Sequence, residues 1–170
     1  MDADSTAPPP DSSAEFPMTT HPVIPLDFGL TEDSGSRFAA CGLSGDLHAA
    51  GSARQFTRAT LSSWGMLAIV DTASIVVSEM LTNAVRYGLD DPAYAPLSSR
   101  PVWLGLLRRE EAVLCTVADP GTGIPVVKEP DWFAETGRGL HIIDSLSESW
   151  GWTPPDEAGK SVWALISAPM

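Results

Sequence analysis

Apolar side chains recur every three or four positions in two early segments of the chain, residues 53–64 and 71–84. This spacing gathers them along one side of a helix, so both segments are predicted to be helices. Gly65 provides a C-terminal stop for the first helix. Asp71 is expected to be the N-cap of the second helix.

Short apolar runs predict five strands, at residues 37–43, 102–107, 112–118, 148–152 and 161–167. A third helix is expected from about Gly139, with Leu140, Ile143 and Leu146 facing inward, after a short helical patch at 131–135. The helices come early, and most strands come late and pair by hairpins. This order favours an α+β fold, a two-layer α/β sandwich with helices on one face of a mixed, mostly antiparallel sheet.

The first 35 residues differ in composition from the rest of the chain. They contain seven acidic residues, six prolines and no Lys or Arg. Such a segment buries too little apolar surface to offset its ordering entropy, so residues 1–35 are predicted to be a disordered acidic tail. Residues 36–170 are predicted to form one globular domain.

Charge and hydropathy narrow the classes of partner. The formal net charge is −12, which argues against direct binding of nucleic acid or of an anionic membrane surface. The chain has no run of 18 apolar residues and no basic N-terminal region, so it is expected to be cytoplasmic. Cys41 and Cys115 lie in apolar segments and are predicted to be reduced core thiols.

One polar pair interrupts the apolar pattern of the second helix. Glu79 and Asn83 are four residues apart, so their side chains project from the same helix face. Asn costs roughly 0.5 kcal/mol relative to Ala inside a helix, and packing does not require it here. The pair therefore indicates a binding function for this face.

Two glycine-containing motifs follow. Asp119-Pro120-Gly121-Thr122-Gly123 comes directly after a predicted strand, and Gly137-Arg138-Gly139-Leu140 opens a predicted helix. Each motif alone is weak, because the first is also a common turn and the second a common helix entry. A helix entry with free N–H groups is nevertheless suited to phosphate.

Taken together, the three motifs resemble the ATP-binding Bergerat fold of the GHKL superfamily, which includes gyrase, Hsp90, histidine kinases and MutL. The resemblance covers about residues 36–168. Within the superfamily the chain is most similar to the small anti-sigma-factor serine/threonine kinases and their actinobacterial relatives. The segments that carry this similarity are 53–56, 77–84, 137–140 and 159–164.

The resemblance implies a role for each motif residue. Asn83 is expected to ligate Mg²⁺ and Glu79 to act as the general base, while Asp119 holds the adenine amino group. Gly121 and Gly123 would lie beneath the base and ribose. Further ATP-binding residues are expected from the glycine pair and the last strand: Gly137, Arg138, Gly139, Leu140 and Ser161, the last as a stand-in for a family threonine.

The expected function is that of an ATP-binding regulator that binds a sigma factor or its antagonist. It could also transfer phosphate to a Ser or Thr of an anti-sigma antagonist, and a homodimer is implied by the resemblance alone. Two alternatives remain at this stage. One is a non-catalytic interaction module of the same fold, and the other is a detached histidine-kinase-type catalytic domain. The short segment between Ile124 and Thr136 disfavours the latter.

Overall fold

The computed structural model describes residues 37–88, 102–121, 123–125 and 138–168. In chain order the elements are β1 (Arg37–Leu43), α1 (Ala49–Ser63), the 3₁₀ helix η1 (Leu67–Ile69), α2 (Val70–Asn83), the π-helix η2 (Ala84–Gly88), β2 (Val102–Arg109), β3 (Ala112–Asp119), α3 (Gly139–Leu146), β4 (Ser149–Trp152) and β5 (Lys160–Ser167). The predicted helical patch at 131–135 and the predicted tail lie outside the described residues.

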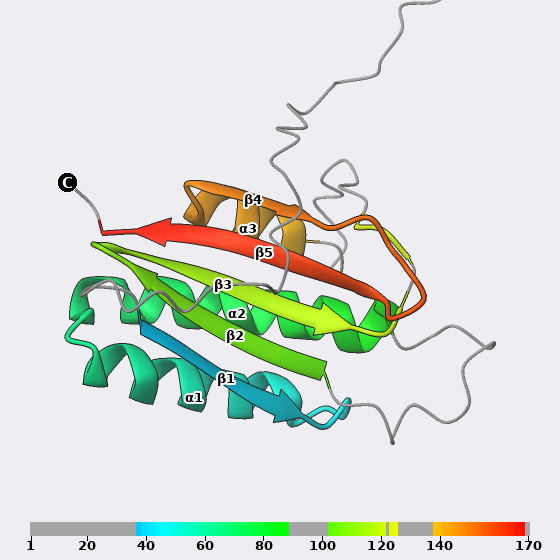
Figure 1. The fold of residues 1–170 in the computed structure, drawn as a ribbon, viewed down its shortest axis with the longest axis horizontal. Coiled ribbons are helices and arrows are strands. Elements are labelled where there is room, and N and C mark those ends of the chain that lie inside the picture. Colours follow the sequence, from blue (N-terminus) through cyan, green and yellow to red (C-terminus); the bar gives the residue numbers. More distant parts are fainter. Residues whose placement is uncertain (1–36, 89–101, 122, 126–137, 169–170) are drawn as a thin grey trace, which may run out of the picture.

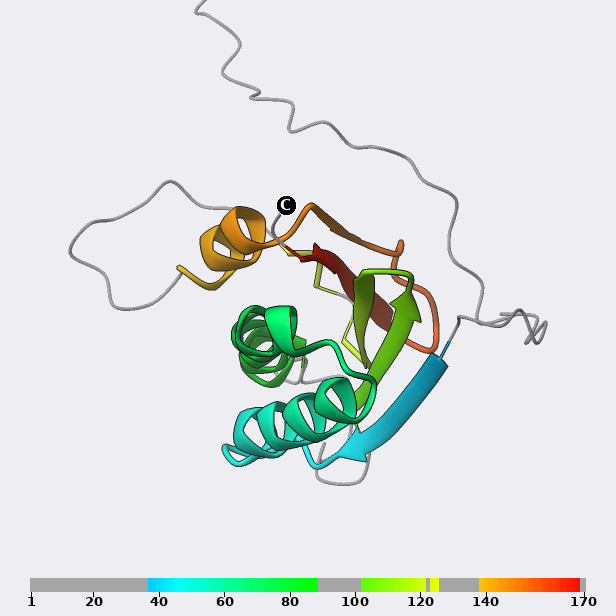
Figure 2. The same cartoon turned by 90° about the vertical axis from the view of Figure 1, so that its left-hand side faces the viewer.

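The strands form one sheet in the order β1-β2-β3-β5-β4, and each neighbouring pair is antiparallel. The three α-helices lie together on one face of this sheet (Figure 1, Figure 2). The predicted α+β sandwich is therefore confirmed, with an antiparallel sheet throughout the described residues.

Strict side-chain alternation in β3 and β5 divides the two faces of the sheet. Val113, Cys115 and Val117 of β3 are fully buried on the helix-covered face. Their register partners on β5 are the buried Ile166, Ala164 and Val162. Because alternate residues share a face, the next pair in this row, Asp119 and Lys160, also points into the interior.

The central helix α2 is buried on several sides, because it packs against α1, α3 and the sheet. This position explains its composition. The continuous helical stretch Leu67–Arg86 has 20 residues and a mean hydropathy of 1.3, so length and apolarity alone would allow it to cross a membrane. More than half of that stretch is buried inside the domain, as expected of a core helix that is apolar nearly all round.

Two details of the predicted helices are wrong. The N-cap of α2 is Ile69, and Asp71 lies within the first turn, where its carboxylate pairs with Arg58 instead of capping. Leu146 is exposed rather than inward-facing, because α3 ends there and only Ile143 of this helix is fully buried. Both differences arise at helix ends, where neighbouring elements decide the boundary.

Candidate functional site

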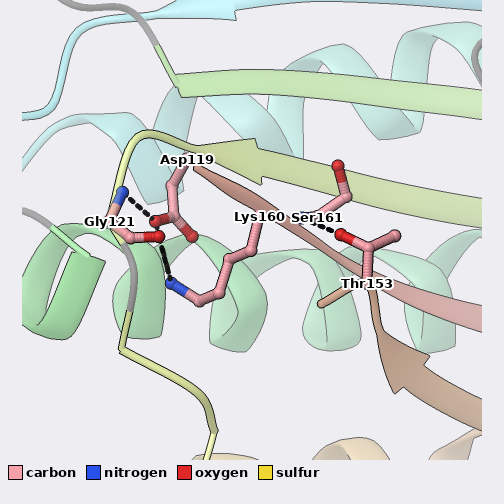
Figure 3. Close-up of polar contacts among 5 residues, drawn as sticks. All are labelled: Asp119, Gly121, Thr153, Lys160 and Ser161. Carbon is pink, nitrogen blue, oxygen red and sulfur yellow. Dashed lines mark hydrogen bonds and ion pairs between the residues drawn. The ribbon is translucent and has the colours of Figure 1, made fainter. Parts of the chain in front are cut away.

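The ends of β3 and β5 bring a carboxylate and an ammonium group together inside the domain. Lys160 Nζ donates to Asp119 Oδ1 at 2.9 Å, and it also donates to the Gly121 carbonyl oxygen at 3.3 Å. The backbone N–H of Gly121 donates to the same Asp119 oxygen at 2.8 Å. The two charged side chains are only 1% and 5% exposed, respectively, so this is a buried ion pair (Figure 3).

The second carboxylate oxygen of Asp119 differs from the first. Oδ2 is buried and has no hydrogen-bond partner among the described residues. Burial raises the pKa of Asp119 above its ordinary value, while the hydrogen bond and charge of Lys160 and the Gly121 N–H oppose that rise. A buried acceptor without a donor is costly, so Oδ2 is a natural binding point for a donor from a ligand.

Gly159 allows β5 to begin this close to Asp119. Its φ is +113°, and a Cβ at this position would overlap the Asp119 carbonyl oxygen and lie 2.6 Å from Pro120 Cα. Side-chain-bearing residues rarely adopt such a φ. The turn that leads into β5 is closed by two backbone hydrogen bonds between Asp156 and Gly159. This local geometry delivers Lys160 to the buried face.

Ser161, predicted to contact adenine, lies on the other side of β5. It is the register partner of Ala118, and its N–H donates to the hydroxyl of Thr153 at 2.9 Å. Figure 3 shows the Lys160 side chain pointing toward Asp119 and the Ser161 side chain pointing away. The structure therefore does not bring Ser161 to Asp119, and Lys160 fills that place.

The pair Glu79 and Asn83 lies near the start of α3. A Cβ built on Gly139 would lie 2.9 Å from Glu79 Oε2 and 3.1 Å from Asn83 Oδ1. Both polar side chains are partly buried. The two residues predicted as base and metal ligand therefore share one face, and the glycine that opens α3 lies directly against them.

Three small polar side chains of α2 form hydrogen bonds within the helix itself. Ser74, Ser78 and Thr82 each donate a hydroxyl hydrogen bond to the carbonyl of the residue four positions earlier, at 2.6–2.8 Å. Such bonds consume hydroxyl donors within the helix. Among the described residues, the carboxylate of Glu79 and the amide of Asn83 are not used by these hydroxyl bonds. The π-turn η2 follows Asn83 directly, and π-turns often occur at functional sites.

The other predicted residues within the described part of the chain adjoin these two clusters in sequence. Gly121 is buried and Gly123 is exposed, just beyond the end of β3. Arg138 is the N-cap of α3, and Leu140 in its first turn packs against the core. Gly137 lies outside the described residues. In Figure 1 the end of β3, the start of β5 and the end of α2 lie at the same end of the molecule.

Arg86, one helical turn beyond Asn83 in sequence, faces a different region. With Thr82 and Val85 it lines a groove of about 410 Å³ against Asp46, which precedes α1, and Ala50, in the first turn of α1. Glu79 and Asn83 are not among the residues that line this groove. The structure therefore separates Arg86 from the Glu79–Asn83 face.

A metal ion at Asn83 would have few protein ligands among the described residues. Among the described residues no group of three His, Cys, Asp or Glu side chains is arranged to hold a metal ion. An amide oxygen beside a carboxylate still fits Mg²⁺, because this ion keeps several waters and is commonly held by one or two protein oxygens together with substrate phosphates. The donor set thus fits a metal that arrives with a nucleotide.

Comparison with protein families decides the classification. The family model of the histidine kinase-like ATPase domain matches residues 43–166, which is most of the chain. The chain belongs to this family. The match spans α1 to β5, and so includes both the Glu79–Asn83 face and the Asp119–Lys160 pair. No curated protein matches the chain significantly.

Solved structures agree on the fold of this ATPase domain. One similar structure contains the RsbU and RsbW domains of Rv1364c from Mycobacterium tuberculosis. The sequence identity is 18% and the TM-score is 0.56, over 78% of this chain and 33% of that one. The chain therefore spans about a third of the length of that relative, and the likeness concerns the fold.

Lys160 is the site residue that the sequence interpretation missed. It is one of only two lysines in the chain, and it follows Gly159 at the start of an alternating apolar strand. Counting back in steps of two from the inward-facing Val162 and Ala164 reaches Lys160, not Ser161. The alternation along β5 therefore indicates an inward-facing Lys160, whereas the resemblance to a family threonine points to Ser161.

Proposed function

We propose that this ATPase-family domain binds Mg-ATP, with adenine at Asp119 and the phosphates between Asn83 and the start of α3. The observation that carries the proposal is that two sets of hydrogen-bond acceptors lie at one end of the molecule. One is the unpartnered Oδ2 of Asp119, and the other is the Glu79–Asn83 pair against Gly139. The N–H groups in the first turn of α3 suit phosphate oxygens.

We further propose phosphotransfer to a Ser or Thr of a partner protein, by a regulator of the anti-sigma kinase type. Glu79 would accept the hydroxyl proton while the hydroxyl oxygen attacks the γ-phosphorus. The bond between that phosphorus and the β–γ bridging oxygen would break, and ADP would leave. Asn83 would hold Mg²⁺, which offsets the negative charge of the phosphates when bound. The partner would be a sigma factor or its antagonist, and the setting cytoplasmic.

The nucleotide part of the proposal is tested by calorimetry with Mg-ATP. Asn83→Ala should abolish measurable binding, and Asp119→Ala should weaken binding about tenfold or more, because a charged acceptor is lost. Thr153→Ala is a useful control, since Thr153 lies on the side of β5 that faces away from Asp119. Equal affinity in all four proteins would overturn the nucleotide site.

The phosphotransfer part needs a partner. A pull-down from native lysate supplies candidates, and transfer of radiolabel from [γ-³²P]ATP to them is then measured. Glu79→Gln should retain Mg-ATP binding and lose transfer by a factor of about 10² or more. If the wild-type protein binds Mg-ATP but labels no captured partner, the domain is a non-catalytic interaction module.

A further inference from the structure

The buried ion pair contains a cation that the proposed recognition of adenine does not use. Asp119 alone would supply the acceptor for an amino group, yet Lys160 is placed within 2.9 Å of it. Burying an ammonium group is costly unless it is paired and hydrogen-bonded. The position of Lys160 therefore requires an account of its own.

The two carboxylate oxygens of Asp119 differ in their hydrogen bonds. Oδ1 accepts from both Lys160 Nζ and the Gly121 N–H, whereas Oδ2 accepts from no described residue. Lys160 is itself anchored by the carbonyl of Gly121. The carboxylate is consequently held by one oxygen in a fixed orientation, and its other oxygen is kept for a further donor.

The charge of Lys160, like its hydrogen bond, favours Asp119 as a hydrogen-bond acceptor. In its buried setting a lone carboxyl group tends to take up a proton, which would turn Oδ2 from an acceptor into a donor. Lys160 opposes this protonation, by its hydrogen bond and by its charge. Adenine presents an amino donor at position 6, whereas hypoxanthine presents an oxygen there. The ionisation of Asp119 therefore decides which base fits.

We propose that Lys160 is a positioning residue that fixes Asp119 as an ionised acceptor, and thereby sets the preference of this site for a 6-aminopurine. The inference rests on the proposed function, since it assumes that the base binds at Asp119. It adds a determinant of base specificity that acts through Asp119 and makes no contact with the base.

Other charged groups on α2, on β2 and in the turn before β5 are arranged differently. The side chain of Asp156, in the turn before β5, accepts from the Ala158 N–H. On α2, Glu79 lies against Gly139. On β2, Arg108 and Arg109 pair with the opposite end of β3. Lys160 is the one charge that perturbs the Asp119 pKa among the described residues.

The test compares Mg-ATP with Mg-ITP, whose base carries oxygen in place of the 6-amino group, by calorimetry from pH 6 to pH 9. The wild type should bind Mg-ATP about tenfold or more tightly than Mg-ITP at pH 7, as one hydrogen bond to a charged acceptor implies. In Lys160→Met the preference should fall below about threefold at pH 7 and return as the pH is raised and Asp119 loses its proton. Lys160→Arg, which keeps the cation, should restore the preference at pH 7.

The control variant is Arg58→Met, which removes a basic residue paired with an exposed aspartate and should change neither the preference nor its pH profile. If Lys160→Met fails to fold, Lys160→Gln serves instead, because it keeps a donor but no charge and predicts the same shift in pH profile.

Three results would overturn the inference. These are an unchanged preference, an equal loss for both nucleotides at every pH, or tighter Mg-ATP binding without the lysine. A wild-type protein that binds neither nucleotide would instead overturn the proposed function.

Discussion

At the sheet end of the site Asp119 and Lys160 are almost completely buried, whereas at the helix end Glu79 and Asn83 are only partly buried. The first pair is fixed by the register of two hydrogen-bonded strands. The second is fixed by side chains of α2 that meet a glycine of α3. Strand register permits no small adjustment, while side-chain ends can move by a few tenths of an ångström. The proposed base-binding end is thus rigid, and the proposed phosphate-binding end is adjustable.

The largest effect on stability is expected from removing one partner of the buried Asp119–Lys160 pair. Lys160→Met leaves a buried carboxyl group without its cation and should lower the free energy of unfolding by about 3–5 kcal/mol at neutral pH. The double variant Asp119→Asn/Lys160→Met should recover most of that loss, because no charge remains buried. Urea unfolding of both variants and wild type measures the difference. Equal stability of the single and double variants would show that charge is irrelevant here.

The pH dependence of this loss has a definite sign. The native pKa of Asp119 is raised, and removal of Lys160 raises it further. Native Asp119 in Lys160→Met then binds a proton more tightly than the unfolded carboxyl does. The deficit relative to wild type should therefore be small near the ordinary carboxyl pKa and grow as pH rises through the raised value. Unfolding at several pH values between 4 and 8 checks this trend.

The next effect concerns the turn that positions Lys160. Gly159→Ala places a Cβ against the backbone of Asp119 and Pro120, at a φ that disfavours alanine. A loss of about 2–3 kcal/mol is expected from urea unfolding. Gly51→Ala is the matched control. Gly51 lies in helix α1, and a Cβ at this position meets nothing within 4 Å. That control should gain about 0.5–1 kcal/mol, and a similar result for both variants would contradict the assigned role of Gly159.

A smaller effect on stability is expected at the adjustable end. Gly139→Ala introduces a Cβ close to the ends of Glu79 and Asn83, which can turn aside. The free energy of unfolding should change by less than about 1 kcal/mol. Mg-ATP affinity should nevertheless fall about tenfold, because the proposed metal ligand and the proposed base are displaced. Unchanged affinity would show that the phosphate end does not use this face.

The smallest effect is expected from an ion pair that lies on the surface. Arg58→Met removes a 2.9 Å contact to Asp71. The side chain of Arg58 is 55% exposed and that of Asp71 is 81% exposed. Water screens such a pair, so the change in unfolding free energy should be at most about 0.5 kcal/mol. A loss comparable to that of Lys160→Met would show that burial does not distinguish the two pairs.

Much of this fold could be predicted from periodicity, because α2 and the β2–β3 hairpin have long, regular patterns. Glu79 and Asn83 could be singled out because a polar pair breaks an apolar stripe. The Asp71 cap was wrong, since the preceding 3₁₀ turn starts the helix earlier and Arg58 takes up the carboxylate. Helix ends depend on neighbours that a local pattern does not contain.

The Lys160 contact shows a different limit. Alternation along β5 predicts that Lys160 points inward, but not which group it meets there. The partner is set by the β3–β5 register, a pairing between residues 41 positions apart. The orientation of a buried cation could therefore be inferred from the sequence, whereas the identity of its anion required the structure.

The position of Lys160 opposite Asp119 also affects which strand register the sheet adopts. If β5 slipped by one residue, Ser161 would lie opposite Asp119 and the indole of Trp163 would turn into the core. The carboxylate would then be enclosed without a cation, and the lysine would be expelled to the other face. A sheet misaligned in this way would be less stable, because Asp119 would lose its ion pair with Lys160. The polar contact at the edge of the core therefore favours the native register of β3 and β5.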